Sequence, residues 1–202
     1  MKKEAQQIVQ EVFYNMSKMY ESIFTSYYPS HGSNGFTERN ITFYFSHFYL
    51  KNAKKLSDII IWQEVPIQGG EHFDTLIIDT LNEMIFIIEA KRLQNEEKFK
   101  SIKADFTRIN DCFKENGTEK KGIKIPTVYS KYDKYAILLT DIWVPENNNK
   151  IKKDIRDNFI DFKSELNIEK SIEKKTIKIE NINNYNHSKE EYWIMYNLYE
   201  IV

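Results

Sequence analysis

Cysteine is almost absent from this 202-residue sequence, in which Cys112 stands alone. A single thiol cannot form an intrachain disulfide, and it excludes a zinc site made of several cysteines. Long apolar runs are missing too, since stretches such as 84–88 are far too short to cross a bilayer. The first residues are polar and charged, which is not typical of a signal peptide. We therefore expect a cytoplasmic protein that does not use a membrane as a partner.

An excess of charge of one sign is also missing. The chain has 29 Lys and Arg residues against 30 Asp and Glu residues, which gives a formal net charge of -1. This balance excludes binding of nucleic acid through an overall basic field, so a polyanion would have to meet a local patch. Lysine clusters recur at 98–103, 120–124 and 150–153. Each could face phosphate after folding, or it could be the solvated side of a helix or loop.

Glycine and proline, which interrupt helices and strands, are few, at 6 and 4 residues. We find no internal repeat and no low-complexity linker. Hydrophobic residues make up 41% of the chain, which is enough for one continuous core, whereas two domains would each have a small one. We therefore predict a single domain over 1–202. It has N-terminal helices at 1–54, a core with the candidate catalytic residues at 55–145 and a C-terminal extension at 146–202.

The spacing of apolar residues predicts an α/β fold. Side chains that recur every three or four residues indicate helices, and short runs of β-branched residues indicate strands. The expected elements are a helix over 8–27, a helix from the N-cap Thr37 to Phe48, strands over 59–62, 73–78 and 84–88, a helix over 94–114, a glycine-bearing loop at 117–122, a strand over 135–144 and a helix over 152–165. The runs at 176–179 and 192–199 are not assigned. This order predicts a mixed central sheet flanked by helices, with hairpins followed by a helical crossover.

Three charged residues stand beside strands that otherwise contain apolar residues. Asp74 lies near the start of the second expected strand, and Glu89 and Lys91 close the third. Side chains alternate along a strand, so Glu89 and Lys91 should share one face while Ala90 points to the other. Antiparallel strands joined by a short turn would bring Asp74 close to Glu89. Two carboxylates and one ammonium group are therefore expected to converge.

This combination suits the hydrolysis of a phosphodiester bond. The reaction places negative charge on the phosphoryl and leaving oxygens, and water is a weak nucleophile at neutral pH. A hard divalent cation answers both needs, and Mg²⁺, for which Mn²⁺ could substitute, prefers carboxylate and water oxygens. Lys91 would stabilise the phosphorane or orient the attacking water. A metal beside it would also lower the pKa of Lys91, because like charges disfavour the charged form.

The pattern resembles the PD-(D/E)xK nuclease superfamily with its restriction-endonuclease-like fold, in which an Asp opens one strand and Glu-x-Lys closes the next. The match here is Asp74 with Glu89-Ala90-Lys91, and Phe73 replaces the proline that often precedes the Asp. The resemblance implies that Asp74 and Glu89 are metal ligands and that Lys91 assists the nucleophile. The Ala90 backbone carbonyl is a further implied ligand.

Two further acids are candidates for the same site. The resemblance covers residues 36–143, and its members often contribute an acid from a helix before the sheet, which is the position of Glu38. Glu38 could instead simply favour the positive end of its helix. Glu64 in the first strand could hold a second cation, as a two-metal mechanism requires, so it is counted among the catalytic and metal-binding candidates. Asp79 at the end of the second strand is expected to be a turn residue.

Four polar residues after the motif are candidate contacts to the backbone of a nucleic acid. Arg92 directly follows the motif, and its side chain would reach a phosphate or point into solvent. The others lie on the expected helix: Gln94, Lys98 and Arg108, with Asp105 on the same helix. Members of the resembled family use polar residues of this helix to support the site or to touch the nucleic acid.

The sequence therefore predicts a Mg²⁺-dependent endonuclease that hydrolyses phosphodiester bonds. The resembled family acts in restriction, repair and phage defence, and DNA is favoured over RNA only because it is the more frequent substrate there. The alternative is an inactive module with the same fold that binds nucleic acid or a protein. A homodimer or a recruiting protein partner is compatible with the resemblance. The sequence has no Walker-type glycine loop, dinucleotide fingerprint or nucleophile elbow, which argues against the enzymes that depend on them.

Overall fold

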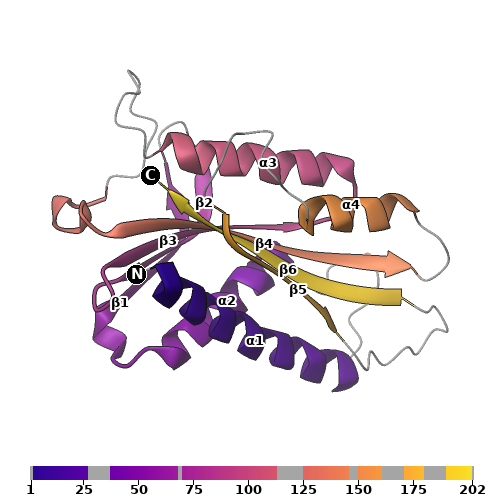
Figure 1. Ribbon diagram of the computed structural model, residues 1–202, viewed down its shortest axis with the longest axis horizontal. Helices are drawn as coiled ribbons and strands as arrows, with labels where there is room; N and C mark the ends of the chain where they lie inside the picture. The colour runs from indigo at the N-terminus through magenta and orange to yellow at the C-terminus, as the bar shows by residue number, and fades with distance from the viewer. Residues whose placement is uncertain are drawn as a thin grey trace.

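The chain folds around one six-stranded mixed sheet, as the computed structural model shows (Figure 1). The structure describes residues 2–26, 37–67, 70–112, 125–145, 150–160, 171–179 and 190–201. Its elements are α1 Lys2–Ser26, α2 Glu38–Asn52, the 3-10 helix η1 Leu56–Asp58, β1 Ile59–Pro66, β2 His72–Asp79, β3 Met84–Arg92, α3 Glu96–Asp111, the 3-10 helix η2 Thr127–Tyr129, β4 Asp133–Pro145, α4 Lys150–Ile160, β5 Ser171–Ile179 and β6 Glu190–Ile201. The strand order is β1-β2-β3-β4-β6-β5. The predicted α/β class, with a mixed sheet flanked by helices, is confirmed.

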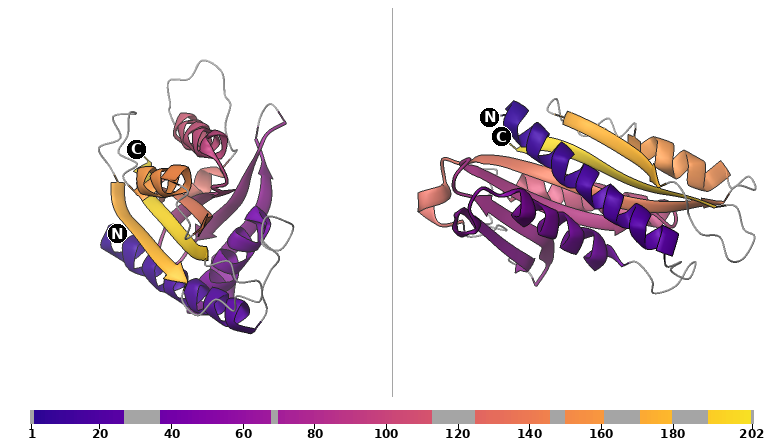
Figure 2. Two further views of the ribbon diagram at one scale, coloured as in Figure 1. Left: turned by 90° about the vertical axis from the view of Figure 1, so that its right-hand side faces the viewer. Right: turned by 90° about the horizontal axis from the view of Figure 1, so that it is seen from below.

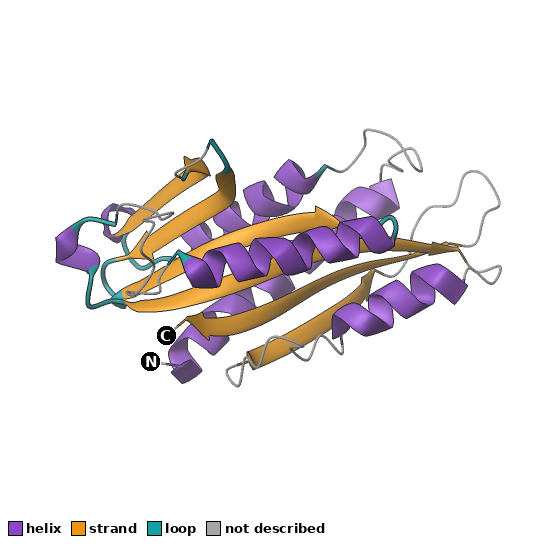
Figure 3. Cartoon of the chain, turned by 90° about the horizontal axis from the view of Figure 1, so that it is seen from above, coloured by secondary structure: helices purple, strands orange, loops and turns teal. Residues whose placement is uncertain are grey.

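Two helices cover each face of the sheet. α1 and α2 lie on one face, and α3 and α4 lie on the other (Figure 1). The view from below shows α1 and α2 crossing the strands, and the view from above shows the other pair (Figures 2 and 3). The result is a three-layer α/β/α arrangement in which both faces of the sheet are buried.

Each layer of helices buries an apolar core against its face of the sheet. α1 contributes a stripe of fully buried side chains at helical spacing, namely Val9, Val12, Phe13, Met16, Tyr20 and Phe24. β3 contributes to both cores, because Phe86 and Ile88 pack with α1 and α2 while Ile85 and Ile87 pack with α3. A strand that is buried on both faces needs apolar residues at every position, which explains its unbroken apolar run.

Length alone would allow α1, at 25 residues, to cross a membrane. Its buried apolar side chains occupy one face only, however, and that face packs against the sheet. Among the described residues, no helix is both long and apolar enough to span a bilayer.

α2 begins where the sequence predicts. Thr37 is its N-cap, with an extended backbone, and the Thr37 N–H donates to the Asn40 side chain at 3.1 Å. Glu38 therefore occupies the first turn of the helix. The backbone N–H of Arg92 donates to Glu38 at 3.2 Å, so the start of α2 meets the end of β3.

β1, β2 and β3 pair as an antiparallel ribbon, as predicted, and a tight turn at 80–83 joins β2 to β3. Asp79 closes the turn between β2 and β3, where its Oδ1 accepts from the Asn82 N–H at 2.9 Å. Its Oδ2 accepts from the Tyr49 hydroxyl of α2, also at 2.9 Å. The prediction that Asp79 is a turn residue is confirmed, and the turn is anchored to the helix layer.

α3 carries the chain from β3 to β4, which runs parallel to β3 from Met84↔Asp133 to Arg92↔Asp141. Such a helical crossover is the connection that parallel neighbours require. Residues 135–144 of β4 are all buried, as their apolar run predicts. The carboxyl end of β3, which holds the candidate residues, is thus fixed by β2 on one side and by β4 on the other.

The C-terminal extension completes the sheet. β6 pairs antiparallel with β4, and β5 pairs antiparallel with the other side of β6. The unassigned runs at 176–179 and 192–199 are therefore strands. The predicted helix over 152–165 is confirmed up to Ile160, and its last residues lie outside the described residues. The predicted loop at 117–122 also lies outside them.

Candidate functional site

Asp74 and Glu89 meet where the β2–β3 ladder ends. The two strands pair as far as Thr75↔Ile88, and Asp74 and Glu89 are the next residues along each strand. The Ala90 N–H donates to Asp74 Oδ2 at 2.7 Å, and the charges of Asp74 and Glu89 act on each other. The structure therefore brings the two predicted carboxyl groups together.

Of these two carboxyl groups, Glu89 is buried and Asp74 is half-buried. Glu89 is 1% exposed, and burial raises its pKa to about 9, assisted by the charges of Asp74 and Asp105 and opposed by Arg108. Burial also raises the pKa of Asp74, although the Ala90 N–H and the Lys91 charge oppose the rise. Two neighbouring carboxyl groups cannot both ionise without repulsion between their charges. The pair therefore holds a proton at neutral pH.

Lys91 shares the face of Glu89, as alternation along β3 predicts. Its Nζ lies 3.4 Å from Asp105 Oδ2 on α3 and 3.9 Å from Glu38 Oε2 on α2. Burial tends to lower the pKa of Lys91, but the surrounding carboxylates, first among them Asp105, outweigh burial and raise it. Lys91 is therefore a cation at neutral pH. The lowering of this pKa by a neighbouring metal stays a prediction.

α3 places two charged side chains over the carboxylates. Arg108 Nη2 lies 2.7 Å from Glu89 Oε1 and 3.0 Å from Asp105 Oδ1. Arg108, a predicted contact to nucleic acid, thus lies inside the site. Asp105 is buried between Lys91 and Arg108, and it is one of the helix residues that the resemblance offers as support for the site. Its signal in the sequence is a carboxylate on the helix face that otherwise carries buried apolar residues.

Glu38 connects the start of α2 to the site. Its Oε1 accepts from the Arg92 N–H and lies 3.7 Å from Lys98 Nζ, while its Oε2 faces Lys91. The predicted residue therefore reaches the site, where its contacts are two ammonium groups and a backbone donor. Its place in the first turn of α2 also favours a carboxylate. The contacts are therefore compatible both with a role of Glu38 in the site and with a role at the positive end of α2.

β1 is irregular at Glu64. The β1–β2 ladder pairs Gln63 with Thr75 and Val65 with Phe73, and it omits Glu64. The φ angle of Glu64 is 53°, in the left-handed region that L residues seldom adopt. As a result, the Gln63 side chain donates to a serine of α2, whereas Val65 packs into the core under α3. The strand changes face at Glu64.

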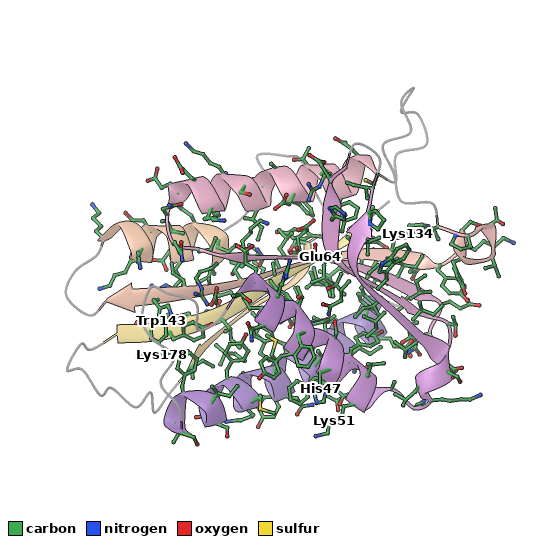
Figure 4. The ribbon with its side chains drawn as sticks, turned by 180° about the vertical axis from the view of Figure 1, so that it is seen from behind. His47, Lys51, Glu64, Lys134, Trp143 and Lys178 are labelled. Carbon is green, nitrogen blue, oxygen red and sulfur yellow. The ribbon has the colours of Figure 1, made fainter. Side chains whose placement is uncertain are left out.

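The Glu64 carboxylate faces α2. Its Oε1 lies 3.4 Å from Arg39 Nε, and the side chain is 55% exposed. Figure 4 shows Glu64 on the side of α2 away from Lys51, which lies near the end of that helix. Among the contacts of the described residues, none joins Glu64 to Asp74 or Glu89. The register places the Glu64 backbone across from Asp74, but no described contact joins its carboxylate to the pair, and its role toward a second cation stays a prediction.

The Arg92 side chain lies on the opposite face of the sheet from Lys91. Its Nε and Nη2 each lie 3.1 Å from Asp141 Oδ2, and the Tyr192 hydroxyl donates to the same oxygen at 2.5 Å. Asp141 is fully buried, and burial raises its pKa to about 6, although Arg92 and Tyr192 oppose the rise. Arg92 is thus the half-buried partner of the buried Asp141, which differs from the phosphate contact and the solvated residue that the sequence suggests.

The remaining candidate contacts to nucleic acid surround the site. Lys98 on α3 lies beside Glu38 and is 44% exposed. Gln94 is exposed after the end of β3, with no side-chain contact to the site among those described. The lysine clusters 98–103 and 150–153 fall on α3 and at the start of α4, on the side of the sheet that holds the site. The cluster 120–124 lies outside the described residues.

The arrangement suits a hard divalent cation held by Asp74 and Glu89. Sites with one or two carboxylates bind Mg²⁺ when water and substrate phosphate supply the other ligands. A cation would also relieve the repulsion that helps to raise the pKa of Glu89. In the described part of the chain, no group of three or more His, Cys, Asp and Glu side chains is arranged to hold a metal by itself. Asp74 and Glu89 would therefore hold a cation together with ligands from the substrate. The Ala90 carbonyl stays a predicted ligand.

Comparison with known proteins gives no match for the chain: no family model, no curated protein and no solved structure matches it. Function is therefore argued from the geometry of the residues themselves.

Proposed function

We propose that the protein is a metal-dependent nuclease of the PD-(D/E)xK type, with a restriction-endonuclease-like fold and with DNA as the favoured substrate. The observation that carries this proposal is the meeting of Asp74 and Glu89 on adjacent strands, with the Lys91 ammonium group on the same face. The sheet topology supports the proposal. The acids lie on the antiparallel strands β2 and β3, and a helical crossover leads from β3 to its parallel neighbour β4.

The two acids hold the cation in this proposal. A bound Mg²⁺ or Mn²⁺ would polarise a phosphoryl oxygen and lower the pKa of a water molecule. Glu89 has to lose its proton to act as a ligand, and its pKa of about 9 opposes this loss. Cleavage should therefore become faster as the pH rises from neutral. Arg108 lies 2.7 Å from Glu89 and keeps the carboxyl group oriented toward α3.

Lys91 acts through its positive charge. A protonated amine cannot take a proton from water, and the carboxylates around Lys91 keep it protonated. The ammonium group instead stabilises the negative charge that develops on the phosphoryl oxygens and orients the attacking water. Glu38 and Asp105 fix its position from α2 and α3.

A purely structural role explains these residues poorly. Burial of ionisable groups costs free energy, and apolar side chains of similar volume often serve the fold as well or better. Acids with strongly raised pKa values cluster at functional sites because catalysis requires unusual protonation states. The alternative of an inactive nucleic-acid-binding module gives no reason for a nearly unexposed Glu89 beside Asp74.

A cleavage assay tests the proposal. The substrates are supercoiled plasmid and linear single- and double-stranded DNA and RNA, each incubated with Mg²⁺, Mn²⁺ or a chelator. Lys91→Ala removes the central charge, and Lys51→Ala is a matched control on an exposed lysine at the far end of α2 (Figure 4). We expect metal-dependent cleavage that Lys91→Ala slows at least about 100-fold and Lys51→Ala leaves unchanged. Intact substrates in every metal would overturn the proposal and favour the binding module.

A further inference from the structure

Trp62 places an exposed aromatic ring beside the candidate site. The residue is 53% exposed and pairs across the β1–β2 ladder with Leu76. Asp74 is two residues from Leu76 on β2, which makes Trp62 and Asp74 diagonal neighbours on adjacent strands. Diagonal neighbours of this kind are roughly 7–8 Å apart, a distance that a large aromatic side chain can span.

Trp62 also faces the same side of the sheet as the carboxylates. Ile61 packs toward the core under α1 and α2, so alternation turns Trp62 to the opposite side. Its partner Leu76 belongs to the core on that side, where Glu89 also meets Arg108 of α3. The change of face at Glu64 comes after Trp62 along β1 and across from Asp74, whose interactions with Glu89 and Lys91 place its carboxyl group on this side.

The part of the sheet that carries Trp62 extends beyond α3. That helix packs mainly on β3 and β4 and reaches β2 through Arg108 over the Phe73 ring, and β1 lies to its side (Figures 2 and 3). Leu76 is nearly fully buried although Trp62 is not, so the indole ring lies outermost on this face. An exposed Trp next to an exposed Ile60 is a surface that gains free energy when a flat apolar group covers it.

We propose that Trp62 stacks on an unpaired base next to the scissile phosphate, which makes the substrate a single strand or a single strand joined to duplex. The inference rests on the proposed function, because it places the phosphate at Asp74 and Glu89. A base is separated from its phosphate by the sugar, a span comparable with that between Asp74 and Trp62. In a duplex the faces of the bases are stacked on one another, so the ring can cover only an unpaired base.

The chemistry of the surroundings favours a nucleotide over other flat ligands. Lys98, half-buried beside Glu38, and Arg108, paired with Glu71, Glu89 and Asp105, lie on the same side of the sheet as Asp74. A strand that stacks on Trp62 could thus keep its phosphates near cations while its base leaves water. Proteins bind single strands by combining aromatic platforms for the bases with cations that contact the backbone.

Binding measurements test this inference separately from catalysis. Fluorescein-labelled oligonucleotides of about 20 nucleotides, as single-stranded DNA, single-stranded RNA and duplex DNA, are titrated in Ca²⁺ and followed by fluorescence anisotropy. Trp62→Ala should weaken binding of single strands roughly 5- to 150-fold, the effect of losing one base–aromatic stack. Trp62→Phe should keep most of the affinity, and duplex affinity should change little. Tyr14→Ala on α1, also 53% exposed but on the other side of the sheet, is the matched control.

Equal affinity of Trp62→Ala and wild type for both single strands would overturn the inference, as would an equal loss in Tyr14→Ala. The DNA and RNA titrations show which sugar accompanies the stacked base, and stacking on either supports it. If Trp62→Ala cleaves single strands at the wild-type rate, the inference is overturned and the proposed nuclease function is unaffected. Absence of cleavage of every substrate in Mg²⁺ or Mn²⁺ would instead overturn the proposed function.

Discussion

Replacing Glu89 by Gln should make the fold more stable while it removes cleavage. Glu89 is buried and has an ordinary pKa of 4.5 but a folded pKa of about 9. Between these values the folded protein holds a proton that the unfolded chain releases, so stability falls as the pH rises. A glutamine side chain resembles the neutral acid, since its amide can donate to Asp74 and accept from Arg108. It has no proton to lose.

The magnitude follows from the pKa difference. Each pH unit above 4.5 costs the wild-type fold about 1.4 kcal/mol through this one group, so the cost at pH 7 is about 3 kcal/mol. For a protein of this size, 1 kcal/mol corresponds to roughly 2–4 °C in Tm. Glu89→Gln should therefore melt roughly 6–12 °C above wild type at neutral pH.

The assay is thermal unfolding by circular dichroism from pH 5 to 9 in a chelator. The difference between Glu89→Gln and wild type should be small at pH 5 and should grow with pH. Glu97→Gln, on an exposed glutamate of α3, is the control for loss of a carboxylate as such. If Glu89→Gln melts below wild type by the same amount at every pH, the ionised Glu89 stabilises the fold through Arg108, and the reasoning is refuted.

Three further outcomes are expected. Lys91→Ala should slow plasmid cleavage about 100- to 1,000-fold, as loss of one transition-state contact does, and an unchanged rate would remove Lys91 from the reaction. Mg²⁺ at a hundred times its Kd should stabilise wild type by about 2.7 kcal/mol in thermal unfolding, and it should not stabilise Asp74→Asn; an equal shift in both would place the cation elsewhere. Arg92→Ala should lower the free energy of unfolding by about 3–5 kcal/mol in urea, because Asp141 loses its buried partner, and a urea midpoint equal to that of wild type would contradict this.

The sequence was most informative where one physical signal dominates. The apolar runs of β2, β3 and β4 are buried on both faces, so their composition alone indicates central strands. Alternation along β3 then suffices to place Glu89 and Lys91 on one face and Ala90 on the other. The meeting of Asp74 with Glu89 needed only the antiparallel pairing of neighbouring strands.

Other features depend on contacts between distant segments, which a local pattern does not contain. β5 carries Glu173, Lys174 and Lys175 in a row and lacks the alternation of a strand, because it lies at the end of the sheet. Arg92 has a buried partner only because β4 brings Asp141 beside it. The change of face at Glu64 depends on one positive φ angle, and no residue type in that segment predicts such an angle.

That irregularity in β1 has a consequence for self-association. β1 is a terminal strand of the sheet order, and its outer side pairs with no other strand in the described part of the chain. A β-branched run such as Ile59 to Ile61 on an open edge is a template on which a second chain can add a strand. The left-handed φ of Glu64 breaks the straight row of backbone donors, and Pro66 lacks an N–H. An added strand could therefore follow β1 for only part of its length, which limits growth of the sheet from one molecule into the next.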